Sequence, residues 1–408
     1  MDTSGFQERK WRIGWLLCFA SALNYIDRNT LAILAPSIQK ELHWSDVDYG
    51  NITALFVFSY TIMYAISGRI IDRIGTRKGF AYSVGSWSLV SVLHAFASTV
   101  GQFSVARFFL GITESANFPA GVRSIAEWFP IRERALAVGL FSAGSAIGAT
   151  LAVPLVTFIA LTWGWRMAFA LTGALGFVWL IFWLKYYYVP ADEEPLQLAD
   201  PVRSVSIKQI LWKKQSWGCF AGRIFIDPVV YFFLFWIPKY LSDVQGLPLA
   251  DIGVTAWLPY AAMGVGTILG GYIPGVLMKR LSWSLDRSRK TIMLISSLLI
   301  PVFCFVLVQP TSAFTAILLL SGILLAHGLW SNLTLPTEVY PKYVQATVTG
   351  IGGTLGGLMS VITQKLIGIT VGEYSYVPVF IFIGSAYLIA FILVQLWIGK
   401  LGQIHSFD

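Results

Sequence analysis

Two ionisable residues, Asp27 and Arg28, lie side by side within an apolar stretch that runs from Trp15 to Ile38. The whole chain is 56% hydrophobic and only 12% charged. A charged side chain at bilayer depth costs about 2.5–3.5 kcal/mol on insertion scales, so such residues normally face a polar cavity and find partners. The placement of this pair therefore indicates a functional site.

The residues around this pair extend the chemistry that one helix face can offer. Asn24 and Tyr25 precede Arg28 by four and three residues, so an amide and a phenol lie on the same side as the guanidinium. Adjacent residues of a helix point about 100° apart, so Asp27 and Arg28 are expected to find their closest partners on other helices. The simpler interpretation, in which Asp27 only neutralises Arg28, stays open.

A second charged pair, Arg107 and Glu114, lies in another apolar stretch, with Gly111 between the two residues. A spacing of seven places both side chains on one helix face, two turns apart. They can pair with each other or exchange partners with a neighbouring helix. The alternative is a static buried ion pair, but desolvation of both charges leaves such a pair little net stability. We therefore favour a functional role.

The second half of the chain also contains candidate residues. Arg223 and Asp227 are four residues apart and can form an ion pair beside Pro228. A structural role for Arg223 in this pair and a role in substrate binding are equally consistent with the spacing. Trp330 and Asn332 are suited to carbohydrate binding, because an aromatic face packs on C–H groups and an amide bonds hydroxyls.

The elements that position these residues are long apolar segments. Runs of about 20 apolar residues recur along the 408-residue chain, and each is long enough to cross a bilayer as a helix. The sequence therefore predicts an all-α polytopic membrane protein with twelve transmembrane helices. The predicted spans are 15–36, 50–71, 79–99, 102–126, 135–160, 166–188, 218–241, 251–277, 290–309, 312–336, 344–371 and 376–399.

One long polar interval divides the predicted spans into six plus six. This division predicts an N-terminal six-helix bundle at 1–188, a cytoplasmic linker at 189–217 and a C-terminal six-helix bundle at 218–408. An even split of this kind is typical of a parallel internal repeat, with two pseudo-symmetric bundles and a substrate site between them near the midplane.

The distribution of positive charge orients the predicted helices. The chain has 29 Lys and Arg residues and a formal net charge of +8. Most of these residues fall on one side of the membrane when both termini are placed inside, so the positive-inside rule predicts cytoplasmic termini. The same distribution accounts for the basic charge without a nucleic-acid partner.

The connection between the second and third spans has a specific pattern, Gly-Arg-Ile-Ile-Asp-Arg-Ile-Gly-Thr-Arg-Lys at 68–78. It resembles the signature loop of the major facilitator superfamily at every defining position, and with the twelve spans the resemblance covers the whole chain. It implies the major facilitator fold, in which this loop helps to latch the cytoplasmic side as access alternates. The resemblance implies gating roles for Gly68, Asp72, Arg73 and Arg77. Gly68 permits close helix approach, and Asp72 can pair with an arginine or cap a helix.

The charged residues resemble a narrower group. Asn24-Tyr25-Ile26-Asp27-Arg28, with Arg107 and Glu114, is similar to the anion:cation symporter branch of that superfamily. The resemblance implies that Arg28 binds the substrate carboxylate and that Asp27 and Glu114 carry protons. It also implies that Arg107 is the switchable partner of Glu114. The chemistry agrees, because a guanidinium stays charged and bonds carboxylates bidentately, whereas buried carboxyl groups can exchange protons.

Two further features concern the substrate. Tyr60 resembles a substrate-binding tyrosine of the sugar-acid members, and the stretch from Asp227 to Tyr240 resembles the hexuronate transporters of the branch. The residues that we assign to substrate binding are Arg28, Tyr25, Tyr60, Trp330, Asn332 and Arg223.

The sequence thus leads to the hypothesis of a proton-coupled symporter in the cytoplasmic (inner) membrane. By alternating access it would import a sugar-acid monoanion, a hexuronate such as glucuronate or galacturonate, and one chain would suffice as a functional monomer. The alternatives are a symporter for an aldonate or another organic anion, and a major facilitator antiporter. Ser145 follows Gly144 where the antiporter pattern has proline, and Arg28 disfavours a cationic substrate. Without metal-ligand or nucleophile motifs, we expect neither an enzyme nor a cofactor.

Overall fold

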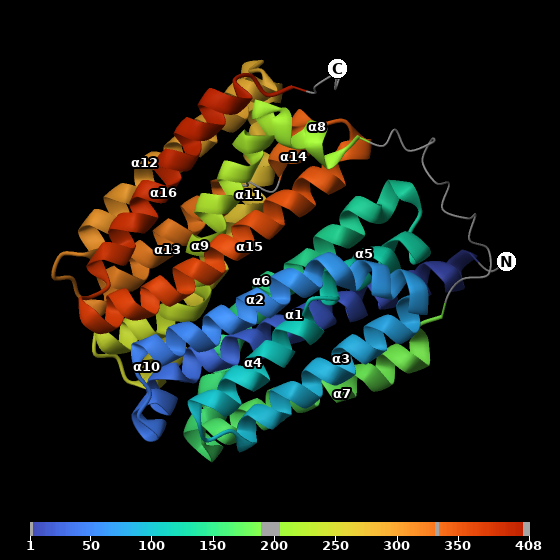
Figure 1. The fold of residues 1–408 in the computed structure, drawn as a ribbon. Helices are drawn as coiled ribbons and strands as arrows, with labels where there is room; N and C mark the ends of the chain where they lie inside the picture. Colours follow the sequence, from blue (N-terminus) through green and yellow to red (C-terminus); the bar gives the residue numbers. More distant parts are fainter. Residues whose placement is uncertain (1–2, 189–204, 331–333, 403–408) are drawn as a thin grey trace. The chain divides into compact units, whose positions relative to one another are not determined.

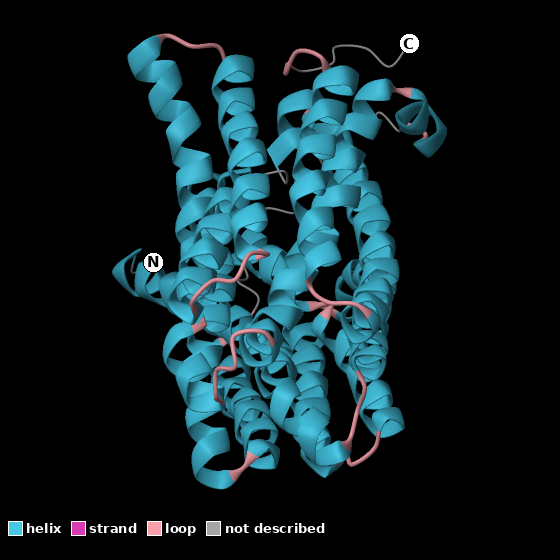
Figure 2. Ribbon diagram, turned by 90° about the vertical axis from the view of Figure 1, so that its left-hand side faces the viewer, coloured by secondary structure: helices cyan, strands magenta, loops and turns pink. Residues whose placement is uncertain are grey.

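Helices make up nearly all of the chain that the computed structural model describes, which is residues 3–188, 205–330 and 334–402 (Figures 1 and 2). Short loops join them, and one 3-10 turn, η1 (His94–Phe96), follows the third helix. No strand occurs among these residues. The all-α fold class predicted from the apolar runs is confirmed.

The chain divides into two compact units, of which the first comprises Met1–Gln197 and Phe235–Trp257. Within this unit α1 packs on α6, α2 on α4 and α3 on α7. Its helices are α1 (Thr3–Leu42), α2 (Asp46–Ile74), α3 (Thr76–Leu93), α4 (Val100–Glu114), α5 (Asn117–Trp128), α6 (Ile131–Trp163), α7 (Trp165–Tyr186) and α10 (Leu249–Thr255).

The second unit comprises Leu198–Leu234 and Leu258–Asp408. In it α12 packs against both α13 and α16. Its helices are α8 (Ile207–Trp212), α11 (Trp257–Leu281), α12 (Leu285–Leu307), α13 (Ala313–Trp330), α14 (Leu335–Val339), α15 (Lys342–Glu373) and α16 (Val377–Ile398). The domain boundaries expected from the sequence stay a prediction, because residues 189–204 of the linker lie outside the described residues.

One helix, α9 (Lys214–Asp243), contributes to both units, since the division falls between Leu234 and Phe235. Its C-terminal end is fastened to α2 within the first unit. The Tyr49 hydroxyl donates to the carbonyl of Phe235 at 2.6 Å, and Lys239 forms an ion pair with Asp46 at 2.8 Å. These contacts explain why the end of α9 belongs with helices that are distant in sequence.

Two of the predicted spans are interrupted close to a proline. The fourth span is divided into α4 and α5, because Pro119 has no N–H to bond the carbonyl of Ser115. The Ser67 hydroxyl donates to that carbonyl instead, at 3.4 Å. In the eighth span, α10 ends at Thr255, four residues before Pro259.

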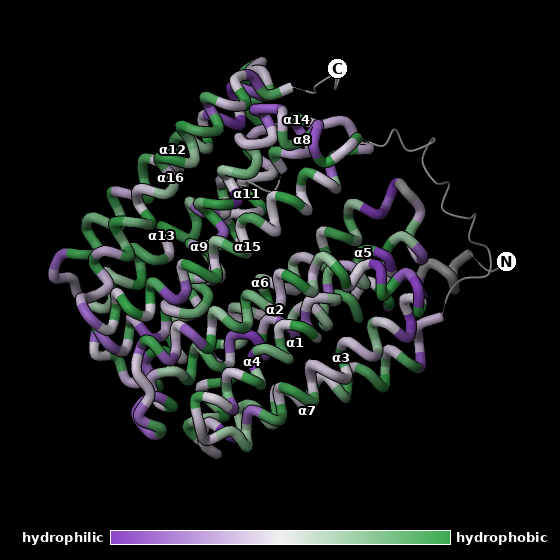
Figure 3. The backbone as a smooth tube through the Cα atoms, viewed as in Figure 1, coloured by the Kyte–Doolittle hydropathy of each residue, from purple (hydrophilic) through white to green (hydrophobic). Residues whose placement is uncertain are grey.

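Nine helices of the described residues are long and apolar enough to cross a membrane. The spans predicted at 15–36, 79–99 and 102–126 are not among these nine. Asp27 and Arg28 lower the mean hydropathy of α1, and α4 and α5 are each short. Figure 3 shows the apolar residues along the helices and the hydrophilic ones concentrated towards turns and helix ends. The polar residues of a candidate site thus lower the mean hydropathy by which the helices that carry them would be recognised as membrane spans.

Small residues set the closest approach between α1 and α6. A Cβ at Gly148 would lie 2.2 Å from the carbonyl oxygen of Ala22, and one at Gly144 would lie 2.2 Å from that of Cys18. Beside these contacts the hydroxyls of Ser21 and Ser145 are 2.8 Å apart. Within a bilayer, close backbone packing and interhelical hydrogen bonds replace the hydrophobic effect as the source of helix association. This packing fixes the position of α1.

Replacing Gly148 by Ala should therefore destabilise the protein, because the α1 backbone must shift to admit the methyl group. We expect the free energy of unfolding to fall by about 1–3 kcal/mol. The thermal unfolding of purified protein in detergent measures this change. Gly139→Ala is the matched control, since Gly139 lies in the same helix with no atom within 4 Å of its Cβ position. Equal midpoints for both variants would contradict the prediction.

Candidate functional site

Arg28 lies at the centre of a buried polar cluster in the first unit, with 4% of its surface exposed. Its Nε donates to Oε2 of Glu114 at 3.0 Å, and its Nη2 lies 3.0 Å from the same oxygen. Nη2 also donates to Oδ1 of Asn24 at 3.1 Å, one helical turn earlier. The arginine of α1 is therefore held by a carboxylate at the end of α4.

Three aromatic rings also surround the Arg28 guanidinium. The Tyr25 and Tyr60 centroids lie 4.8 and 4.7 Å from its central carbon, and the Phe56 centroid lies at 5.3 Å. A cation is attracted to an aromatic face over such distances. Tyr25 and Tyr60 were assigned from the sequence, whereas Phe56 was missed. Its spacing of four from Tyr60, on the same helix face, was the signal that could have found it.

Arg107 is also buried, with 2% exposed, but it has fewer partners. Its Nη1 donates to the backbone carbonyl of Arg28 at 3.1 Å, whereas its Nε and Nη2 have no hydrogen-bond partner among the described residues. In this structure Glu114 pairs with Arg28 and not with Arg107, and the switching role that the resemblance implies for Arg107 stays a prediction. Seven residues separate Arg107 and Glu114 by about 10.5 Å along α4, while α1 brings Arg28 directly to Glu114.

A glycine between these charges brings α2 against α4. A Cβ at Gly111 would lie 2.1 Å from the Ser59 hydroxyl and 2.5 Å from the carbonyl oxygen of Phe56. Only a residue without a side chain permits this approach. Gly111 therefore allows Phe56 and Tyr60 of α2 to reach the arginine on α1.

Asp27 has a partner on a different helix from that of Arg28. Its Oδ1 accepts a hydrogen bond from Ser91 of α3 at 2.8 Å, and its Oδ2 has no partner among the described residues. The adjacent Asp27 and Arg28 thus point to α3 and α4, as the helix geometry predicted.

This cluster is suited to anion binding and proton exchange. Arg28 and Arg107 are permanent cations, whereas Asp27 and Glu114 can take up protons. Across residues 3–188, 205–330 and 334–402, no group of three or more His, Cys, Asp and Glu residues could hold a metal ion.

The signature loop is held by an ionic network within the first unit. Asp72 forms an ion pair with Arg123 of α5, and Nε of Arg123 bonds Glu127 at 2.9 Å. Thr76 donates to Oε1 of Glu127 at 2.5 Å, and the Tyr187 hydroxyl donates to Oε2. Sequence reasoning missed Arg123 and Glu127, although their spacing of four indicates a helical ion pair.

The other residues predicted to gate differ in their contacts. A Cβ at Gly68 would meet Pro119 at 3.9 Å, an ordinary van der Waals distance, so packing here does not demand glycine. Nη2 of Arg77 donates to the carbonyl of Leu184 at 2.5 Å, which ties the loop to α7. Arg73 is exposed. Their gating roles stay predictions.

In the second unit Arg223 forms an ion pair with Asp227, Nε to Oδ2, at 2.8 Å. Glycines of α15 make room for it. A Cβ at Gly356 would lie 2.3 Å from Oδ2 of Asp227, and one at Gly353 would lie 3.3 Å from Nη2 of Arg223. The pair expected from the spacing is thus present and fits closely against α15.

Trp330 lies in the core of the second unit, 2% exposed. Its ring meets those of Tyr387 and Phe391 at centroid distances of 5.7 and 6.4 Å. The Tyr387 hydroxyl in turn lies 2.6 Å from Nδ1 of His327. Asn332 lies outside the described residues. The sugar contacts assigned to Trp330 and Asn332 therefore stay predictions.

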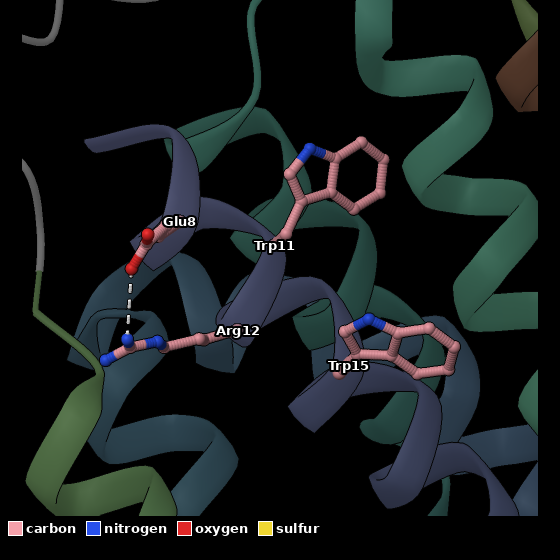
Figure 4. Close-up of a pocket in the computed structure, with 4 residues that line it drawn as sticks. All are labelled: Glu8, Trp11, Arg12 and Trp15. Atoms are coloured by element: carbon pink, nitrogen blue, oxygen red, sulfur yellow. Dashed lines mark hydrogen bonds and ion pairs between the residues drawn. The ribbon is translucent and has the colours of Figure 1, made fainter. Parts of the chain in front are cut away.

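A surface hollow of about 520 Å³ lies at the start of α1, away from the buried polar cluster around Arg28 (Figure 4). Glu8, Trp11, Arg12 and Trp15 line it, and Nη2 of Arg12 bonds Oε2 of Glu8 at 3.2 Å. Arg12 and Arg28 are about 24 Å apart along a helix that rises about 1.5 Å per residue. The hollow is therefore separate from the charged cluster.

Comparison with known proteins identifies relatives over most of the chain. The sequence profile of the Major Facilitator Superfamily matches residues 17–364. The hexuronate transporter of Escherichia coli (strain K12) is 32% identical over 390 residues, which cover 91% of this chain and 90% of the relative. The galacturonate transporter of Dickeya chrysanthemi is 36% identical over 305 residues, 71% of this chain and 88% of the relative.

A solved structure has the same fold. A bacterial homologue of the human lysosomal transporter Spinster, in an inward-facing and unoccupied conformation, superposes with a TM-score of 0.82 at 17% identity. The match covers 96% of this chain and 98% of the other. It supports the fold predicted from the twelve spans.

The close fit of the Arg223–Asp227 pair against α15 predicts that Gly356→Ala destabilises the second unit. The methyl group must displace the carboxylate of Asp227, so we expect an overpacking cost of about 1–3 kcal/mol, measured as a lower thermal unfolding midpoint. Gly350→Ala is the matched control in the same helix, because nothing lies within 4 Å of that Cβ position. An unchanged midpoint for Gly356→Ala would show that the carboxylate moves freely.

Proposed function

The chain belongs to the Major Facilitator Superfamily, and on that premise we propose that it imports a sugar-acid monoanion together with protons. The chain is a multi-pass membrane transporter and not an enzyme. The observation that carries the proposal is the buried Arg28, whose carboxylate partner Glu114 can itself be protonated. The relatives named for hexuronate and galacturonate support a hexuronate, such as glucuronate or galacturonate, as the substrate.

Competition for Arg28 provides the coupling. Both Nε and Nη2 of Arg28 contact one oxygen of Glu114, so a substrate carboxylate that uses these donors must displace it. Protonation removes the negative charge of Glu114 and frees the guanidinium for the anion. The proton switch therefore acts on Arg28 directly, and Arg107 adds a second positive charge nearby. Asp27 is the second proton site in this mechanism.

The neighbouring phenols favour a hydroxylated anion. Tyr25 and Tyr60 are half-buried beside the Arg28 guanidinium. Their hydroxyls can donate to and accept from the oxygens of a sugar ring. Trp330, Asn332 and Arg223 are proposed as further substrate contacts from the second unit.

The transport cycle would use both the proton gradient and the membrane potential. Two protons moving with one monoanion carry one net positive charge inward. At 100 mV this contributes about 2.3 kcal/mol, which corresponds to about fiftyfold accumulation. Alternation of access would involve Gly68, Asp72, Arg73 and Arg77 as the cytoplasmic gate. The proposal places the protein in the inner membrane, with both termini cytoplasmic, as a functional monomer.

Uptake into proteoliposomes tests the proposal. Purified protein would be offered a panel of uronates, aldonates and other organic anions, under separately imposed pH and voltage gradients. Uronate accumulation driven by an inward proton gradient is expected. Preference for an aldonate would support the alternative substrate class, and export driven by an inward proton gradient would indicate an antiporter. The absence of uptake of any sugar acid under either gradient would refute the proposal.

Replacing Arg28 by Ala should abolish substrate binding, because it removes the cation assigned to the carboxylate. Charge-assisted hydrogen bonds contribute about 1.5–3 kcal/mol each, so uptake at a fixed substrate concentration should fall at least about tenfold. Initial rates of uptake measure this loss. Arg12→Ala is the matched control, since it removes another arginine of α1, which is exposed and paired with Glu8. If both variants transport normally, Arg28 is not the anion ligand.

Replacing Glu114 by Gln should separate exchange from accumulation. The amide mimics a permanently protonated carboxyl group, so Arg28 stays available to the anion while the proton step is lost. We expect substrate counterflow to persist and accumulation driven by a pH gradient to disappear, both measured in the same proteoliposomes. Normal accumulation by this variant would show that Glu114 has a structural role.

A further inference from the structure

The ring of Phe56 lies over two guanidinium groups. Its centroid is 5.3 Å from the central carbon of Arg28 and 5.9 Å from that of Arg107. The Tyr25 and Tyr60 rings, in comparison, face Arg28 alone.

The position of this ring is fixed on several sides. Phe56 is completely buried, and α4 meets its backbone at Gly111, where a Cβ would lie 2.5 Å from the Phe56 carbonyl oxygen. Tyr60 stacks on the ring at a centroid distance of 5.9 Å, and the Phe235 ring meets it edge-on at 5.9 Å. The ring therefore has little freedom to leave the arginines.

The two arginines differ in what else can hold them. Arg28 is paired with Glu114, whereas Nε and Nη2 of Arg107 have no partner among the described residues. A buried cation with few hydrogen bonds gains most from an aromatic face, where the attraction is strongest because water is excluded. The attraction of the ring also does not depend on the protonation of any carboxyl group.

We propose that Phe56 is a positioning residue that keeps the Arg28 and Arg107 guanidiniums in place while Glu114 is exchanged for the substrate carboxylate. This inference rests on the proposed function. When the anion displaces Glu114, Arg28 loses its ion pair before the new one is complete. The Phe56 ring stays in contact through that exchange, and it holds Arg107 beside the backbone of Arg28 throughout. Phe56 thus preorganises the anion site without contacting the anion.

The test compares Phe56→Leu with wild-type protein in proteoliposomes that take up the sugar acid. Leucine keeps an apolar side chain but removes the aromatic face. Loss of preorganisation should raise the KM about 5- to 30-fold, with the maximum rate nearly unchanged. Phe80→Leu is the matched control, because Phe80 is completely buried in the same unit and packs against Trp179 and Trp183 rather than an arginine. It should leave the KM unchanged.

A second series separates the aromatic face from the shape of the side chain. Phenylalanines with one, two and three fluorine atoms, placed at position 56, weaken the ring's attraction for cations in steps and nearly preserve its volume. The KM should rise with each step. A flat series, or a Phe56→Leu KM within about twofold of the wild-type value, would overturn this inference alone. No sugar-acid uptake by the wild-type protein would overturn the proposed function and this inference with it.

Discussion

A buried cation needs a partner, and this requirement governs the first unit. Arg28 is almost inaccessible to solvent and pairs with Glu114 at 3.0 Å. In such surroundings, removal of one partner leaves an uncompensated charge, which is far more costly than the net stability of the intact pair. The pair requires α1 and α4 to keep a fixed position relative to each other along their axes. The glycines that bring α1 against α6 and α2 against α4 provide that fit.

The sequence predicted the helical fold class and the superfamily, and both are confirmed. These predictions succeeded because runs of apolar residues and a loop pattern are local properties of the chain. The same holds for the Arg223–Asp227 pair, which depends only on a spacing of four along one helix. The Asp72–Arg123 pair was foreseen in part, since pairing with an arginine was one of two roles open to Asp72 and no particular arginine was indicated.

The remaining features depend on tertiary packing and left little trace in the sequence. The spacing of seven allowed Glu114 to pair with Arg107 or with a residue of a neighbouring helix. The approach of α1 makes Arg28 its partner. Ser91 looks like any other helix serine until α3 places it 2.8 Å from Asp27. Similarly, nothing in the local composition of α9 indicates that the boundary between the two compact units falls between Leu234 and Phe235.

Under the proposed function, the unpartnered nitrogens of Arg107 link ligand binding to thermal stability. Buried polar groups without hydrogen bonds lower the stability of a fold by about 1–3 kcal/mol each, and Nε and Nη2 are two such groups among the described residues. The anion of the proposed function would offset that deficit if it supplied acceptors to these nitrogens. Any ligand that binds only the folded state stabilises it in proportion to the logarithm of its concentration above Kd. The melting temperature of detergent-solubilised protein thus becomes a direct assay for ranking candidate anions, independent of reconstitution into vesicles.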